Sequence, residues 1–150
     1  MNKTIYLLLP VAFALTGCEQ STSFLPSKSS SSTPEIVEHD YREISAQKID
    51  WNDIFTQPQN EYQIYFYSLT CAHCKNLKNK VIEYGLKNDN FFFIEASEKV
   101  VIVEDVSYTI GSTSISEMGI LGYPSLIKIE QKVCVFNVAG ESEIISKLNL

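Results

Sequence analysis

Residues 65–75 read Tyr-Phe-Tyr-Ser-Leu-Thr-Cys-Ala-His-Cys-Lys, and this stretch decides the fold. An aromatic, strand-like run ends at two cysteines separated by two residues, and a helical pattern begins at once. Cys71 is therefore predicted at the first turn of a helix, where unpaired backbone N–H groups and the helix dipole stabilise a thiolate. Cys74 follows one helical turn later, on the apolar stripe, so it is expected to be the more buried cysteine of the pair. Because a thiolate is the nucleophile of disulfide exchange, the spacing indicates redox chemistry between these two residues.

The composition of the chain predicts one ordinary globular domain. The 150 residues are 45% hydrophobic and carry a net charge of −6, which argues against nucleic acid as a partner. Four cysteines are too few for a disulfide scaffold, so their spacing indicates separate fates for Cys18 and Cys134. Cys134 is expected to be a buried, unreactive thiol, and a third redox thiol is the alternative if it proves exposed.

Residues 1–17 have the features of an export signal. Lys3 supplies the positive charge, and the apolar run over residues 5–15 is too short to span a bilayer. The sequence Leu-Thr-Gly before Cys18 resembles the lipobox of bacterial lipoproteins, which implies that Cys18 is lipidated and becomes the first residue after cleavage. An ordinary secretory signal with a chance cysteine is the alternative.

Residues 18–40 are rich in serine and contain prolines, and they bury almost nothing apolar, so they predict a disordered tether. The folded domain is then expected over residues 41–150. A lipid on Cys18 would hold this domain at the extracytoplasmic face of the cell membrane, in the cell envelope or periplasm.

Hydrophobic periodicity within residues 41–150 predicts an α/β fold with a mixed sheet and helices on both faces. Within the connection over residues 98–110, the apolar run over residues 100–103 is either a strand or a packed loop. Short helices are expected after Asp50 and Ser114, and the longer helices over residues 71–87 and 141–150. Strands are expected over residues 41–49 (weakly), 62–68, 91–96, 125–129 and 133–138, the last two as a hairpin.

This order of elements resembles the thioredoxin superfamily. A Cys-x-x-Cys pair opens a helix after a strand, and Gly-Tyr-Pro-Ser-Leu at residues 122–126 precedes a hairpin and a final helix. The resemblance covers nearly all of residues 41–150 and implies a thioredoxin-like fold. It implies that Cys71 attacks and Cys74 resolves, with their redox-active disulfide in place of any other cofactor and without a metal. It also implies that Tyr123–Pro124 is a cis peptide beside the disulfide, and that the Tyr123 backbone binds the client chain as an added strand.

The chain departs from the thioredoxin pattern near the motif. A histidine directly before the second cysteine resembles the pattern of the more oxidising members of the superfamily. In those proteins the imidazole stabilises the thiolate and raises the reduction potential. His73 would do this for Cys71 here, and the alternative is that it only faces solvent. Tyr65 stands where thioredoxins carry a buried aspartate, so the usual proton acceptor for the resolving thiol is missing. Asn79 replaces a helix proline, and extra length falls around residues 98–109.

Together these features predict a membrane-anchored, extracytoplasmic protein thiol–disulfide oxidoreductase that acts as a monomer. Its partners would be proteins with thiols or disulfides, together with an electron source or acceptor such as a membrane thiol donor. The direction of transfer stays open, because His73 favours an oxidant or isomerase whereas many anchored family members reduce client cysteines. Two other functions compete with this one. They are delivery of a soft metal such as copper(I) through Cys71, His73 and Cys74, and non-catalytic binding of a partner in the groove.

Overall fold

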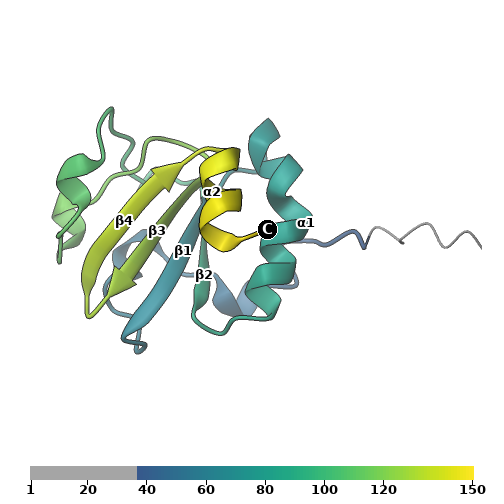
Figure 1. The fold of residues 1–150 in the computed structure, drawn as a ribbon, viewed down its shortest axis with the longest axis horizontal. Coiled ribbons are helices and arrows are strands. Elements are labelled where there is room, and N and C mark those ends of the chain that lie inside the picture. The colour runs from purple at the N-terminus through teal and green to yellow at the C-terminus, as the bar shows by residue number, and fades with distance from the viewer. Residues whose placement is uncertain (1–36) are drawn as a thin grey trace, which may run out of the picture. The chain divides into compact units, whose positions relative to one another are not determined.

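The computed structural model describes residues 37–150, so the predicted export signal, the lipidated Cys18 and most of the tether lie outside the described residues. One four-stranded sheet has the spatial order β2-β1-β3-β4 (Figure 1), with β1 parallel to β2 and antiparallel to β3, and β3 antiparallel to β4. The thioredoxin-like α/β fold class with a mixed sheet is thereby confirmed. The strands and longer helices are β1 (Glu61–Tyr67), α1 (Ala72–Leu86), β2 (Phe91–Glu95), β3 (Ser125–Glu130), β4 (Val133–Ala139) and α2 (Glu141–Leu148).

The central strand β1 is buried on both faces, as its aromatic sequence predicts. Its side chains alternate between two separate core clusters, because successive residues of a strand point to opposite faces. Tyr65 and Tyr67 enter the cluster that contains the helices, whereas Tyr62, Ile64 and Phe66 enter the other. All five are fully buried, which fixes the register of the strand that leads directly to the cysteine pair.

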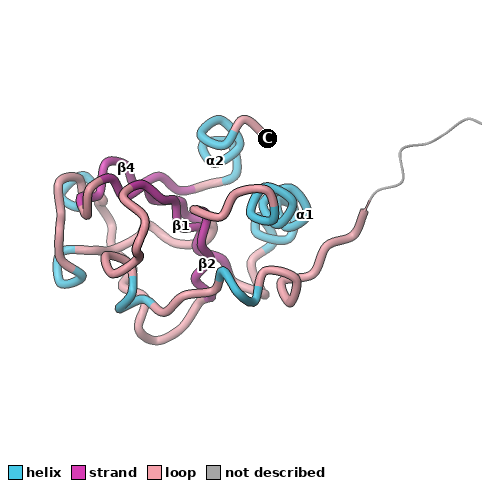
Figure 2. Tube along the Cα trace, turned by 90° about the horizontal axis from the view of Figure 1, so that it is seen from below, coloured by secondary structure: helices cyan, strands magenta, loops and turns pink. Residues whose placement is uncertain are grey.

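Both α-helices pack on the same face of the sheet, and Figure 2 shows α1 and α2 on one side of it. The prediction of helices on both faces is therefore wrong for the α-helices. The second face is covered by the 3-10 turns and loops that hold Trp51, Ile54, Met118 and Ile120. The connection between β2 and β3 lacks a long stretch of helical periodicity, so it packs its apolar residues from short turns instead. The turns in this connection are η3 (Ser107–Thr109) and η4 (Ile115–Glu117), whereas η2 (Trp51–Asp53) precedes β1.

The weak strand expected over residues 41–49 is also wrong. This segment forms a turn and the 3-10 helix η1 (Ser45–Gln47), and its β-bridge to the sheet is the isolated one between Lys48 and Phe93. Tyr41 and Ile44 are its buried residues, and their spacing of three suits a helical turn rather than the alternation of a strand.

Residues just before the predicted boundary at residue 41 also contact the domain. The backbone N–H of His39 donates to the Asn79 side chain on α1 at 3.0 Å, and the His39 ring contacts Glu43 at 3.0 Å. The last residues assigned to the tether therefore lie against α1.

The connection over residues 98–110 is a loop packed against the rest of the domain. Of the two interpretations, strand or packed loop, the structure therefore supports the packed loop. The Val103 N–H donates to the Ile120 carbonyl at 2.9 Å, and the buried Asn137 amide of β4 donates to Thr109 at 3.0 Å and to the Gly119 carbonyl at 2.7 Å. Just beyond it, the Gly111 N–H donates to the Cys134 carbonyl at 2.8 Å, and the Cys134 N–H donates to the Ser112 carbonyl at 2.9 Å. The loop is thus fastened to the outer edge of β4. Within residues 37–150, no helix combines the length and apolar character that crossing a membrane requires.

Candidate active site

Cys71 is the N-cap residue of α1. Its backbone is extended (φ −76°, ψ 123°), and its sulfur accepts a hydrogen bond from the backbone N–H of Cys74 at 3.3 Å. An N-cap side chain takes one of the N–H groups that the first helical turn leaves unpaired. The structure therefore places this sulfur at the positive end of the helix, where the sequence predicts it and where a thiolate is favoured.

Cys74 lies one turn into α1 and is nearly closed to solvent, with 1% of its surface exposed. It packs in one cluster with Leu77 and Val81 of the same helix face. Burial raises the pKa of the Cys74 thiol to about 12, and the nearby Cys71 thiol acts in the same direction. The pair thus divides into a partly exposed sulfur at the helix end and a buried sulfur that stays protonated at neutral pH; both are free thiols in the structure.

The loop before β3 closes the other side of the site. The Cys71 thiol donates to the backbone carbonyl of Tyr123 at 3.2 Å, and the Tyr123–Pro124 peptide bond is cis. The loop is held by the Ser125 hydroxyl, which donates to the Gly122 carbonyl at 2.7 Å, and by the Gly140 N–H, which donates to the Pro124 carbonyl at 2.9 Å. The predicted site residues of both segments therefore meet in the fold.

His73 lies apart from this contact. Its side chain is 69% exposed, and its Nδ1 atom pairs with the Glu141 carboxylate of α2 at 3.4 Å. The Asn76 side chain donates to the same Glu141 oxygen at 3.3 Å. Within residues 37–150 the hydrogen bonds of the Cys71 sulfur go to Cys74 and Tyr123, so the imidazole is directed at α2 instead. The predicted effect of His73 on the Cys71 thiolate stays a prediction.

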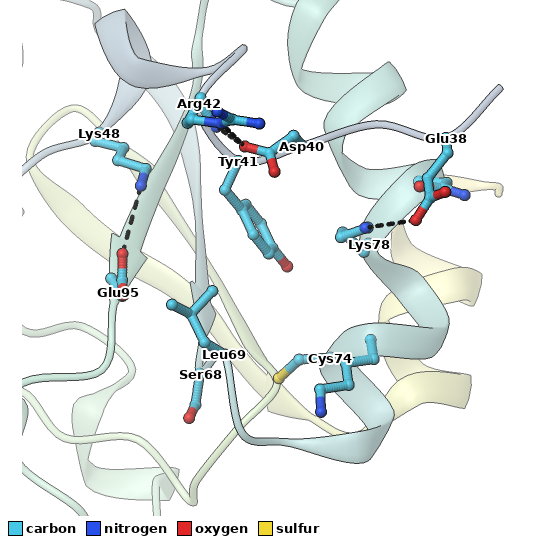
Figure 3. Close-up of a pocket in the computed structure, with 12 residues that line it drawn as sticks. Glu38, Asp40, Tyr41, Arg42, Lys48, Ser68, Leu69, Cys74, Lys78 and Glu95 are labelled. Carbon is cyan, nitrogen blue, oxygen red and sulfur yellow. Dashed lines mark hydrogen bonds and ion pairs between the residues drawn. The ribbon is translucent and has the colours of Figure 1, made fainter.

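A cavity of about 660 Å³ lies behind the pair, between α1 and residues 38–48. The Cys74 sulfur and the Tyr41 ring both point into it (Figure 3). Its rim carries the ion pairs Lys48–Glu95 at 3.4 Å and Lys78–Glu38 at 3.6 Å. Sequence analysis did not place Tyr41 at the site. The sequence pattern that could have revealed its position is the three-residue spacing between Tyr41 and Ile44, which indicates a packed turn and not a strand.

The remaining cysteine of the described region, Cys134, is fully buried in β4, which confirms the prediction of an enclosed thiol. Its thiol donates to the Phe136 carbonyl at 3.4 Å, and burial raises its pKa to about 11. In the part of the chain from residue 37 onward, no group of three or more His, Cys, Asp or Glu side chains is gathered as metal ligands would be.

The sequence matches no protein-family model and no curated protein. Solved structures similar to this chain include thioredoxin f from spinach chloroplast (12% identity, 69% of this chain and 83% of that chain covered, TM-score 0.46). Thioredoxin f2 of Chlamydomonas reinhardtii is similar at 15% identity over 68% of this chain and 92% of that one, with a TM-score of 0.43. Mitochondrial thioredoxin 3 of Saccharomyces cerevisiae has 14% identity over 69% and 92% of the two chains, with a TM-score of 0.44.

Proposed function

We propose that this protein is a protein thiol–disulfide oxidoreductase, anchored by a lipid on Cys18 at the extracytoplasmic face of the membrane. The observation that carries the activity is the hydrogen bond from the Cys74 N–H to the Cys71 sulfur at the start of α1. It stabilises negative charge on the sulfur that is partly exposed, while burial keeps the Cys74 thiol neutral. One sulfur is thus suited to attack a client, and the other is held in reserve to resolve the product.

The exchange proceeds in two steps. The Cys71 thiolate attacks one sulfur of a client disulfide and forms a mixed disulfide, and the second client sulfur leaves as a thiolate and takes up a proton. Cys74 then loses its proton and attacks the Cys71 sulfur, which forms the Cys71–Cys74 disulfide and releases the first client sulfur. Two electrons pass from the pair to the client, and the reverse sequence oxidises a client dithiol.

Client binding uses the Tyr123 backbone beside Pro124. In the reduced protein the Tyr123 carbonyl accepts a hydrogen bond from the Cys71 thiol, with 3.2 Å between the oxygen and the sulfur. When Cys71 ionises it has no proton to donate, so this carbonyl loses its Cys71 partner, and an N–H of an extended client segment replaces that hydrogen bond. Ionisation of the nucleophile and availability of the client site are thereby linked through one atom.

The membrane location rests on the sequence before residue 37. An export signal that ends in Leu-Thr-Gly-Cys18, followed by a serine- and proline-rich tether, supports a lipid-anchored protein whose domain stands off the membrane. Proteins with exposed thiols or disulfides are then the clients, and a membrane thiol donor or acceptor completes the cycle.

The reduction potential of the Cys71–Cys74 pair tests this function and gives its direction. The full-length chain with Cys18→Ser is equilibrated in glutathione buffers of defined ratio, and the Cys71–Cys74 disulfide is quantified by mass spectrometry. A potential near −270 mV assigns a reductase, and one above about −180 mV assigns an oxidant or isomerase. If no disulfide forms between these two residues at any ratio, the proposed function is wrong.

A further inference from the structure

Tyr41 and Tyr65 each carry a buried hydroxyl group that has no hydrogen-bonding partner within residues 37–150. A buried polar group without a partner is unfavourable, and most buried hydroxyls in proteins are paired. Tyr65 is fully buried on β1, and Tyr41 retains 9% exposure. Two such hydroxyls in one place therefore require a reason beyond packing.

Both hydroxyls lie beside the resolving cysteine. Tyr41, Tyr65 and Cys74 belong to one buried cluster, and the Tyr65 hydroxyl is close enough to the Tyr41 hydroxyl and to the Cys74 thiol to affect the pKa of each, although neither pair has the full geometry of a hydrogen bond. Burial raises the pKa values of both tyrosines far above the usual value, so each phenol stays protonated. The three groups form a row of neutral, proton-bearing atoms in the interior.

Stacking with the Tyr67 ring of β1 fixes the orientation of the Tyr41 and Tyr65 rings. The Tyr67 ring stacks on the Tyr41 ring, with centroids 3.8 Å apart and planes 12° apart, and it lies nearly parallel to the Tyr65 ring at 6.3 Å. The Tyr67 hydroxyl is itself occupied, because it donates to the Glu95 carboxylate at 3.0 Å. Tyr67 therefore orients the other two rings without having a free hydroxyl of its own.

The row ends at the cavity behind the pair. Tyr41 and Cys74 line this cavity together with the carboxylates of Glu38, Asp40 and Glu95 (Figure 3), whereas Tyr65 is not among its lining residues. Water in the cavity and these carboxylates can take up a proton. Cys74 must lose a proton before it can attack, and its sulfur is nearly closed to bulk solvent.

We propose that the hydroxyls of Tyr65 and Tyr41 form a proton relay that carries the Cys74 proton to the cavity when the mixed disulfide is resolved. This inference rests on the proposed function. The Cys74 S–H bond breaks as the Tyr65 oxygen accepts the proton; Tyr65 passes its own proton to Tyr41, and Tyr41 passes its proton to water in the cavity. The Cys74 electron pair then forms the bond to the Cys71 sulfur. Both phenols end neutral, and the client sulfur leaves with the electrons of the broken mixed disulfide.

The test uses the full-length chain with Cys18→Ser and the aromatic disulfide 5,5′-dithiobis(2-nitrobenzoate) as the probe. Attack by Cys71 releases the first coloured thiolate, and resolution by Cys74 releases the second, so stopped-flow absorbance reads the two steps separately. In Tyr65→Phe we expect the second phase to slow at least tenfold at pH 7, because general acid–base transfer contributes about 10²-fold or more. The first phase should stay within twofold of the unsubstituted rate.

The pH profile separates a relay from a packing effect. Without the relay, Cys74 must lose its proton to hydroxide, so the second phase of Tyr65→Phe should rise about tenfold per pH unit and its defect should shrink above pH 9. Tyr41→Phe should show the same pattern. Tyr84→Phe is the matched control, since it removes the hydroxyl of a tyrosine that packs against the same cluster but donates to Gln63 outside the relay, and its second phase should be unchanged.

The outcomes are distinct. Loss of an unpartnered hydroxyl should leave the thermal unfolding midpoint of Tyr65→Phe at or above that of the parent chain. A second phase in Tyr65→Phe and Tyr41→Phe within twofold of the parent, at every pH, overturns the relay and leaves the oxidoreductase function standing. It would mean that the proton leaves Cys74 directly to cavity water. A parent chain that never releases the second thiolate overturns both proposals.

Discussion

The thiol of Cys71 donates a hydrogen bond to the backbone carbonyl of Tyr123 at 3.2 Å, across 52 positions of the chain. This contact joins the start of α1 to the loop before β3. The Cys71 sulfur is thereby held in a partly exposed position, while Cys74 one turn later is enclosed. The reactivities of the thiols should differ accordingly.

We expect iodoacetamide to modify Cys71 first in the reduced, folded Cys18→Ser protein, which keeps three cysteines. Cys74 and Cys134 are almost fully buried, and burial raises their pKa values to about 12 and about 11, so neither offers an accessible thiolate near pH 8. Mass spectrometry of digested samples taken over time measures the order of labelling. After unfolding in urea, all three thiols should react at similar rates. Labelling of Cys134 as fast as Cys71 in the folded protein would contradict the enclosed position of β4.

The reduced protein should lose stability as the pH rises above about 9. Cys134 and Cys74 have raised pKa values when folded, so between their unfolded and folded pKa values the unfolded state has lost protons that the folded state keeps. Their contribution to the free energy of unfolding is complete below the unfolded pKa of about 8.5 and declines as the pH approaches 11 to 12, by up to about 1.4 kcal/mol per pH unit for each thiol. Urea unfolding at pH 8, 9 and 10 measures this.

Cys134→Ala provides the comparison for the pH dependence. It removes one titrating thiol, so its stability should fall less steeply between pH 9 and pH 10 than that of the parent chain. An equal slope in the two proteins would show that Cys134 does not hold its proton in the folded state.

Glu141→Gln should raise the reduction potential of the cysteine pair slightly. The Glu141 carboxylate pairs with the exposed His73 ring next to the start of α1. Removing this negative charge favours the Cys71 thiolate, which stabilises the reduced form. Exposed pairs contribute about 1 kcal/mol or less, which corresponds to a rise of at most about 20 mV. Glutathione equilibration measures the potential. Glu143→Gln makes the same change of charge in the same helix turn, so an equal rise there would assign the effect to overall charge and not to His73.

Gly85→Ala should destabilise the fold by roughly 1–2 kcal/mol. A Cβ atom at Gly85 would lie 2.6 Å from the Phe93 ring, where α1 crosses β2. Overpacking of this kind costs about 1–3 kcal/mol, and the better helix propensity of alanine returns up to about 1 kcal/mol of it. Denaturant unfolding gives the difference. Lys80→Ala, at an exposed position of the same helix, should change stability by less than about 0.5 kcal/mol. A Gly85→Ala protein as stable as this control would mean that the helix moves away from the sheet at no cost.

Local patterns were sufficient to predict the centre of this fold. The aromatic run of β1, the helical spacing after Cys71 and the hairpin of β3 and β4 each depend on residues close in sequence, so periodicity identifies them. The Cys-x-x-Cys spacing likewise specifies the N-cap position without knowledge of the rest of the chain.

Features that depend on distant segments could not be predicted in this way. The pairing of His73 with Glu141 joins residues 68 positions apart, and nothing in either local sequence specifies it. Residues 41–49 resemble a strand in composition, yet they form a turn. The side chains of Tyr41 and Ile44 are buried there because α1 and β2 leave space for them. The row of hydroxyls behind Cys74 likewise exists only once β1 and this turn meet.

The two hydrogen bonds between Cys134 and residues 111 and 112 bear on how neighbouring molecules behave. An open strand edge pairs readily with the same edge of another copy. Over this stretch of β4 the chain already occupies the outward N–H and carbonyl with its own loop. The fold therefore resists edge-to-edge aggregation along this stretch of β4.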